Sequence, residues 1–422
     1  MNDDYTLLWY GVGNYTINFL ERRIWLDRHI TAFIDNDATK QESLFRKKPV
    51  IKPKNLNAYT YDYIVIGSLQ YFREMKESLL DLVEENKIIS VRELSGKLIS
   101  EIYENKRLPS NIWLEASTLC QLNCKSCYMR LGDYGTMGKG YLKFDNFKKL
   151  IDTSPYVEQI ELSNSGEIFL NPDLKKIIEY AHIKNVGLSA YNGCNFNDVS
   201  DDILECLVDN EFIGLTVSVD GATQSAYSAY RRNGNIEKVF KNLQKLISIK
   251  TKKKSQYPRI IWQYIIMESS EADITEAKKK AENLGIPIYF KLTWDQSYVP
   301  KNPEMIKRET GLNCITVKEY SEQYENSYNS SCRELFEYPA INWDGRLLGC
   351  CRVYDDDFGV NVFEIGLENA LKSYKYKLAQ KYLMGDVEIS EKEDHIPCLH
   401  CSELHFIKDK NTKGIKAIVG EE

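Results

Sequence analysis

The chain has 422 residues, of which 43% are hydrophobic and 27% are charged, and this composition is typical of a globular protein with several domains. Its formal net charge of −6 argues against nucleic acid as a partner. The sequence contains no apolar run long enough to cross a bilayer. It also does not begin with the basic region and following apolar run of a signal peptide. Eleven cysteines then indicate metal ligands or free thiols in a reducing compartment. We therefore expect a cytoplasmic protein that binds neither nucleic acid nor membrane.

The first 97 residues alternate apolar runs with turns, in the pattern of a small nucleotide-binding fold. Strands are expected at 7–10, 30–34 and 61–66. The first runs into Gly11-Val-Gly13 and a helix, and Asp35 directly follows the second. A glycine turn at a helix N-terminus can bind phosphate, and the acid can hold a ribose. Thr16 stands where the third glycine of the G-x-G-x-x-G fingerprint belongs.

This region resembles the small Rossmann-like modules attached to bacterial sugar-modifying and glycan-biosynthesis proteins. The resemblance rests on the run from Phe33 to Asp37 and on the later Lys48-Pro-Val-Ile51. The alternative is a domain that keeps the fold, binds no cofactor and serves docking or dimerisation. Residues 98–110, which end near Arg107-Leu-Pro109, are expected to form a linker.

Residues 111–305 repeat a strand-then-helix pattern. The expected strands are 113–116, 159–163, 187–191, 214–219, 260–266 and 288–292. The clearest helix covers 271–284 and is closed by Gly285. Six such units predict an α/β fold with a parallel sheet curled into a partial (β/α)6 barrel. Active residues of such a barrel lie at the carboxyl ends of its strands.

Three cysteines follow the first strand of this region: Cys120, Cys124 and Cys127, with Tyr128 next. They lie within eight residues, and the sequence offers no nearby fourth ligand. Structural zinc requires four ligands. Three thiolates suit a [4Fe–4S] cluster with one open iron better. The spacing and the trailing aromatic residue resemble the cluster loop of the radical S-adenosylmethionine (radical SAM) enzymes.

The resemblance extends over residues 111–300 and implies a site for SAM on the same rim. Ser165-Gly166-Glu167 resembles the glycine-glycine-glutamate turn that meets the SAM amino group, with Ser165 replacing the first glycine. Ser218 matches the residue that reaches the ribose. Arg231 matches the arginine that pairs with the carboxylate, although Arg232 is an alternative. The complete set expected to bind SAM is Tyr128, Ser165, Gly166, Glu167, Asn192, Ser218 and Arg231.

Four further polar residues are candidates for contact with substrate. Lys291 and Asp295 lie at the end of the sixth strand, while Glu115 and Gln263 lie on the first and fifth strands. The alternative is that these residues are hydrogen-bonded polar groups of the barrel interior.

A second set of cysteines lies in residues 306–422. A strand enters a hairpin turn at Asp344-Gly345, which returns the chain toward Cys332. A structural zinc site is an alternative on spacing alone. The spacing resembles the SPASM-type extension of radical SAM enzymes, in a shortened, twitch-like form with one auxiliary cluster. The expected ligands are Cys332, Cys350, Cys398 and Cys401, with Cys351 or Cys314 as possible replacements for one of them.

The resemblance implies an oxidoreductase that reductively cleaves SAM to a 5′-deoxyadenosyl radical, which abstracts hydrogen from a substrate C–H bond. It implies two [4Fe–4S] clusters, one of them auxiliary, and an electron donor such as flavodoxin or ferredoxin. The auxiliary cluster favours a net oxidation or an epimerisation, and the front domain favours a sugar or nucleotide-linked sugar as substrate, in glycan or natural-product biosynthesis. A peptide- or protein-modifying maturase is the first alternative. A non-catalytic zinc-binding protein is a more remote one.

Overall fold

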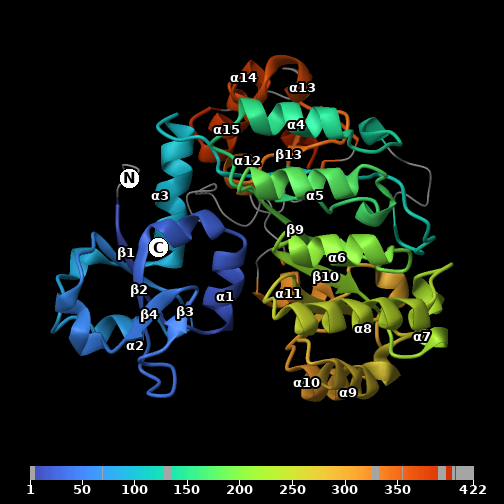
Figure 1. Cartoon of the computed structure of the whole chain (residues 1–422), viewed down its shortest axis with the longest axis horizontal. Coiled ribbons are helices and arrows are strands. Elements are labelled where there is room, and N and C mark those ends of the chain that lie inside the picture. The colour runs from blue at the N-terminus through green and yellow to red at the C-terminus, as the bar shows by residue number, and fades with distance from the viewer. Residues whose placement is uncertain are drawn as a thin grey trace. The chain divides into compact units, whose positions relative to one another are not determined.

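The structure is a computed structural model that describes residues 5–68, 70–127, 135–324, 328, 332–353, 355–387, 396–401 and 404. The chain divides into two compact units between Asn111 and Ile112 (Figure 1). Each unit has its own sheet. Among the described residues, no helix combines the length and the apolarity that crossing a bilayer requires.

The first unit is built on a parallel sheet in the strand order β4-β2-β1-β5-β6. β1 lies in the middle, with β2 on one side and β5 on the other, and this is the order of a Rossmann-type fold. A short strand, β3, pairs antiparallel with β4 at the edge. The strands are β1 (Leu7–Tyr10), β2 (Ile30–Ile34), β3 (Leu44–Phe45), β4 (Lys48–Ile51), β5 (Tyr63–Ile66) and β6 (Ile88–Ser90).

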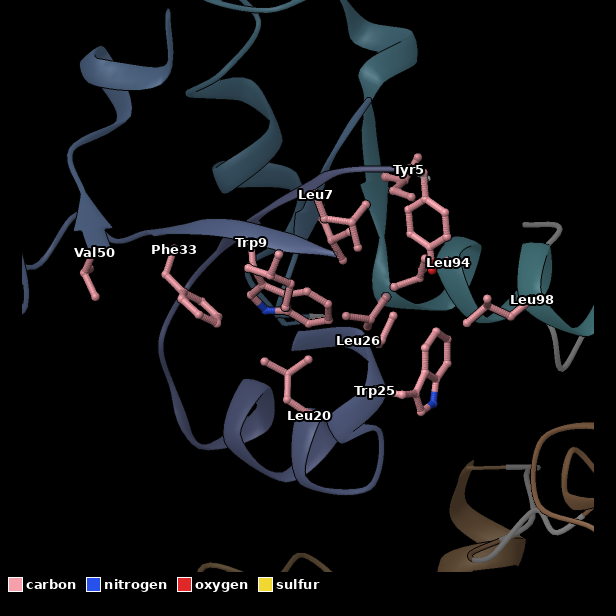
Figure 2. Packing of buried hydrophobic residues seen from close by; sticks show 14 residues of the cluster. Tyr5, Leu7, Trp9, Leu20, Trp25, Leu26, Phe33, Val50, Leu94 and Leu98 are labelled. Carbon is pink, nitrogen blue, oxygen red and sulfur yellow. The ribbon is translucent and has the colours of Figure 1, made fainter. Parts of the chain in front are cut away.

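Helices cover this sheet and bury aromatic side chains against it. Figure 2 shows Trp9 of β1 beside Leu20, with Leu26 and Trp25 close by. The helices are α1 (Asn14–Glu21), α2 (Phe72–Glu77) and α3 (Val91–Tyr103). α3 begins with a capping box, in which Ser90 Oγ accepts from Glu93 N at 3.1 Å and Ser90 N donates to the Glu93 carboxylate. Residues 98–103, expected as linker, are therefore the second half of this helix.

The second unit has an eight-stranded sheet in the order β12-β11-β10-β9-β8-β7-β13-β14. Its first six strands follow one another along the chain, and the pairs from β8 to β12 are parallel. This is the expected α/β architecture of a radical SAM barrel, and the predicted fold class is confirmed. The six strands are β7 (Asn111–Leu114), β8 (Gln159–Glu161), β9 (Gly187–Cys194), β10 (Gly214–Ser218), β11 (Arg259–Ile265) and β12 (Ile288–Lys291).

Amphipathic helices line this sheet, and Figure 1 shows α4, α5, α6 and α8 one after another alongside it. Each buries one apolar face, as Leu204, Leu207 and Val208 do on α6. α9 ends at Gly285, whose φ of 64° allows the left-handed turn predicted there. The helices are α4 (Phe144–Thr153), α5 (Leu174–Ile183), α6 (Asp201–Asp209), α7 (Gln224–Tyr230), α8 (Ile236–Lys253) and α9 (Ile274–Leu284).

The C-terminal extension adds a hairpin to the same sheet. β13 (Ala340–Ile341) pairs antiparallel with β14 (Leu347–Gly349) and parallel with β7. The predicted turn contains Gly345 at φ 95°, where a Cβ would lie 2.3 Å from Asn361 Oδ1. The helices of this part are α10 (Pro303–Thr310), α11 (Val317–Tyr324), α12 (Glu334–Glu337), α13 (Val362–Ile365), α14 (Leu367–Leu371) and α15 (Tyr374–Met384).

Candidate active site

The loop with the first three cysteines lies at the carboxyl edge of the second sheet, as predicted. Its backbone is held at the end of α7, because Asn123 N donates to Arg232 O at 2.9 Å and Lys125 N donates to Tyr230 O at 3.3 Å. The Ser126 hydroxyl donates to the carboxylate of Asp295, which follows β12. The loop is thus fixed by segments that follow β10 and β12.

The three thiols of this loop lie within electrostatic range of one another. Burial raises the pKa of Cys120 to about 12; the Glu167 carboxylate adds to the shift, and the thiols of Cys124 and Cys127 raise it further. Burial also raises the pKa of Cys124, whereas the nearby Arg231 guanidinium lowers it. Protonated thiols are thus favoured without a cation, and metal ions would replace these protons.

Arg231 lies beside this loop and is paired with Asp220. Arg231 Nε donates to Asp220 Oδ2 at 2.6 Å, and Asp220 Oδ1 accepts from Ile265 N at 2.8 Å. The side chain of Asp220 is fully buried and that of Arg231 is 12% exposed. The guanidinium is therefore held by one edge in a fixed orientation. The alternative residue, Arg232, supplies its backbone carbonyl to the loop instead.

The turn at Ser165-Gly166-Glu167 packs directly against the segment that leads into the cysteine loop. A Cβ on Gly166 would lie 2.2 Å from Ser117 O, so only glycine fits there. Glu167 N donates to Leu119 O at 2.8 Å. The Glu167 carboxylate is buried and accepts from Asn195 N at 2.6 Å, and burial raises its pKa to about 7. Its side chain is turned toward the protein backbone.

Ser218 lies at the end of β10, against a glycine of the neighbouring strand. Gln263 Nε2 donates to Ser218 Oγ at 3.2 Å. A Cβ on Gly193 would lie 2.7 Å from Ser218 Oγ, and Gly193 has φ 129°. Asn192 is exposed on the same edge and donates from Nδ2 to Asn164 Oδ1 at 2.8 Å. These amide and hydroxyl groups form a neutral polar rim.

The four candidates for substrate contact lie in different settings. Glu115 is buried beneath the Ser165 turn and accepts from Ser165 N at 3.0 Å, while its Oε1 is buried without a hydrogen bond. Asp295 is bound to Ser126, and Gln263 to Ser218. Lys291 is partly buried at the end of β12. Three of the four thus contact the candidate SAM site, and Tyr128 lies outside the described residues.

The second set of cysteines gathers in the C-terminal extension. Burial raises the pKa of Cys398, and the thiols of Cys332 and Cys401 raise it further. Burial likewise raises the pKa of Cys350; the Glu334 carboxylate adds to it, followed by the thiols of Cys351 and Cys398. Cys332, Cys350 and Cys401 therefore all lie within electrostatic range of Cys398.

The two possible replacement ligands are distinguished by their surroundings. The Cys351 thiol is hydrogen-bonded to the Glu334 carboxylate, and Cys351 N donates to Glu334 Oε2 at 2.8 Å. Cys314 is buried elsewhere and donates to Gln323 Oε1 at 3.2 Å. Cys350, by contrast, lies within electrostatic range of Cys398.

The donors of both cysteine sets are thiols, the ligands that iron–sulfur clusters use and that zinc also accepts. In the part of the chain that the structure describes, no three His, Cys, Asp or Glu side chains converge closely enough for a single metal ion.

The glycine turn of the first unit is hydrogen-bonded to side chains of the same unit. Thr16 Oγ1 donates to Gly11 O at 2.6 Å and accepts from Trp9 Nε1 at 3.0 Å. Asp35, which would hold a ribose, accepts from Val12 N at 2.8 Å and from Lys40 Nζ at 3.3 Å. The acid therefore stabilises the turn itself.

Several residues of the site carried no sequence signal that assigned them a role. Asn195 contacts Cys120 and Glu167, and Ser126 anchors the loop to Asp295. Asn164 donates to Cys351 O at 3.3 Å and so joins the rim to the second cysteine set. For Asn195, the available sequence signal was that Asn195, Asn197 and Asp198 directly follow β9.

The parallel sheet, the cysteine loop at its carboxyl edge and the cysteine-rich extension define a radical SAM fold with a SPASM-type C-terminal domain. The crystal structure of Streptococcus suis SuiB bound to S-adenosylmethionine superposes with a TM-score of 0.51 and 13% identity, covering 74% of this chain and 75% of that chain. At this identity the similarity establishes the fold.

Two sequence comparisons add to this. Mycofactocin maturase MftC of Mycobacterium tuberculosis is 24% identical over 152 residues, which is 36% of this chain and 37% of that protein. The chain thus matches little more than a third of this curated relative. Residues 3–89 match the family model described as C2185-like, N-terminal.

Proposed function

We propose that this protein is a radical SAM enzyme whose first cluster is held by Cys120, Cys124 and Cys127. The observation that supports this best is that a loop with three thiols, a buried arginine and a glycine turn lie together at one edge of the sheet. With three protein ligands, one iron remains for SAM. Bound together, cluster and SAM supply reductive cleavage of a carbon–sulfur bond and hydrogen abstraction from substrate.

The role of the protein is to orient SAM and to exclude water from it. Arg231 is held through Nε, which leaves its two Nη groups for the SAM carboxylate. Ser218 is placed for the ribose, and Gly193 keeps the space beside its hydroxyl open. We assign the SAM amino group to the backbone of the Ser165-Gly166 turn, because the Glu167 side chain binds Asn195 N.

Cys332, Cys350, Cys398 and Cys401 are proposed to hold an auxiliary [4Fe–4S] cluster. Four protein ligands leave no open iron for substrate, so this cluster would accept or relay an electron. Electron transfer of this kind favours a net oxidation, with epimerisation as the related outcome. A flavodoxin or ferredoxin would supply the starting electron.

A sugar or nucleotide-linked sugar is the first substrate class. It is supported by the Rossmann strand order of the first unit and by the neutral polar rim of Asn164, Asn192 and Ser218, which suits hydroxyl groups. The bonds that Asp35 makes to its own turn weaken the argument for a nucleotide in that unit.

A peptide is the second substrate class, because the curated relative is a maturase named for mycofactocin. Amide side chains such as Asn164 and Asn192 also suit a peptide backbone. The two substrate classes are distinguished by whether added sugar nucleotides or added peptides are needed to observe turnover.

The test is anaerobic reconstitution followed by reduction with SAM, scored by 5′-deoxyadenosine release. The wild type should bind about eight irons per chain and cleave SAM. Cys124→Ala should keep about four irons and lose cleavage, while Cys314→Ala should retain both. Unchanged cleavage by Cys124→Ala, or a colourless, zinc-containing wild type, would contradict the proposal. Pools of sugar nucleotides and of peptides, added separately, then identify the substrate class by stimulated release.

A further inference from the structure

We propose that the side-chain amide of Asn195 is a hydrogen-bond donor to the sulfur of Cys120 and thereby sets the reduction potential of the first cluster. Asn195 Nδ2 lies 3.6 Å from Cys120 Sγ, which is hydrogen-bonding distance to sulfur. This inference rests on the proposed function, since it requires a cluster bound to Cys120.

The orientation of the amide is fixed by its other bonds. Asn195 Oδ1 accepts from the backbone N–H of Asn197 at 3.0 Å. A backbone N–H can only donate, so the atom that faces it is the oxygen. The nitrogen is therefore the atom that points to Cys120, and it also donates to Gln121 Oε1 at 3.1 Å. Gln121 Nε2 donates back to Asn195 Oδ1 at 3.1 Å.

The turn that carries Asn195 is rigid and strained. Asn195 is 4% exposed and its backbone N–H is bound to Glu167. The next residue, Phe196, is fully buried with φ 59°, a left-handed conformation that is rare for a bulky side chain. Phe196 packs edge-on against Phe169 at 5.3 Å, and its carbonyl accepts from Asn242 Nδ2 at 3.0 Å. Surrounding contacts thus hold the strained turn, as is common where a residue has a role in a site.

The expected effect follows from charge. A reduced cluster carries one more negative charge, which spreads onto its thiolate sulfurs. An N–H dipole aimed at a sulfur stabilises this reduced form more than the oxidised form and raises the potential. Asn195 would therefore ease the first electron transfer into the site.

The experiment is an EPR-monitored redox titration of the reconstituted protein, with the first cluster identified by its absence in Cys124→Ala. Asn195→Leu removes the donor. At the wild-type midpoint potential, its ratio of reduced to oxidised cluster should fall by about three- to tenfold, where tenfold corresponds to 59 mV for one electron. Asn195→Asp keeps the acceptor for Asn197 but places a carboxylate oxygen against the sulfur, so its ratio should fall further.

Asn242→Leu is the matched control, because it removes an amide that supports the same turn without facing the sulfur. Its ratio should stay within about twofold of wild type. Loaded Asn195 variants with the wild-type midpoint would overturn the inference, and so would an equal shift in Asn242→Leu. A wild type whose iron content equals that of Cys124→Ala would instead contradict the proposed function. If Asn195→Leu does not fold, the near-isosteric Asn195→Asp decides the question.

Discussion

Asp220 and Arg231 form a buried ion pair at the candidate SAM site, with 2.6 Å between Oδ2 and Nε. Burial alone would lower the pKa of Arg231, but Asp220 and then Cys124 hold it raised. The guanidinium is therefore charged at every working pH. The pair also connects β10 to β11, because Asp220 Oδ1 accepts from Ile265 N.

Asp220→Asn should destabilise the protein by about 3 kcal/mol, since it leaves a buried guanidinium without its counter-charge. Urea unfolding under anaerobic conditions measures this loss. SAM binding should weaken as well, because Arg231 loses its fixed orientation. Asp201→Asn, which removes an exposed partner of Lys245, should cost less than about 1 kcal/mol. Equal losses in both variants would contradict the assigned importance of the buried pair.

Glu115 should make stability depend on pH. Burial raises its pKa from 4.5 to about 8, opposed by hydrogen bonds from Ser165. The folded state therefore holds a proton between pH 4.5 and 8 that the unfolded state releases. Stability from this group is full below pH 4.5 and is lost as the pH rises to 8, by at most about 1.4 kcal/mol per unit.

Glu115→Gln, which resembles the protonated acid, should be as stable as wild type near pH 5 and should lose less stability up to pH 8.5. Denaturation curves at a series of pH values measure the difference. Glu282→Gln, at an exposed position on α9, is expected to keep the wild-type slope. An unchanged slope in Glu115→Gln would mean that this carboxyl stays ionised in the folded protein.

The neighbouring thiols Cys350 and Cys351 should differ in their effect on iron content. Cys350 lies within electrostatic range of Cys398, whereas the Cys351 thiol is hydrogen-bonded to Glu334. Cys350→Ala should lose about four irons per chain and Cys351→Ala should keep them. Iron analysis of the two reconstituted variants provides the measurement. The reverse result would make Cys351 the ligand.

Asp295 should determine how firmly the first cluster is held. Its bond to Ser126 ties the cysteine loop to the end of β12, and the same bond lowers the pKa of Asp295. Asp295→Ala should release iron to a chelator several-fold faster from the first cluster, while Asp295→Asn, which retains an acceptor oxygen, should lie nearer wild type. If Asp295→Ala releases iron at the wild-type rate, Asp295 does not hold the first cluster and has another role, for example contact with substrate.

Sequence patterns located the strands because burial on both faces makes each a short apolar run between helical repeats. β10 is buried at every position and β12 ends at Lys291, one residue before its expected end. The candidate cluster ligands carried a sequence signal because iron–sulfur chemistry uses cysteines at close spacing. Helix α3 continues into the expected linker because Leu98, Ile99 and Ile102 recur at helical spacing and are buried.

The hydrogen-bond partners of individual side chains could not be predicted from the sequence. Glu115 and Asp295 were expected near substrate, yet the direction of each depends on a turn from another part of the chain, at Ser165 and Ser126. Asn195 reaches Cys120 across 75 residues through a left-handed turn that no local pattern encodes. Such contacts arise from tertiary packing, so only the structure reveals them.

The pairing of β13 with β7 has a consequence for any shortened form of the protein. β7 lies between β8 and β13, so its backbone is hydrogen-bonded on both sides only while the extension is present. A version ending before α12 would expose the edge of β7, and an unprotected edge invites aggregation. Barrel and extension therefore form a single cooperative folding unit, and deleting the auxiliary cysteines one at a time is the sounder way to separate their roles.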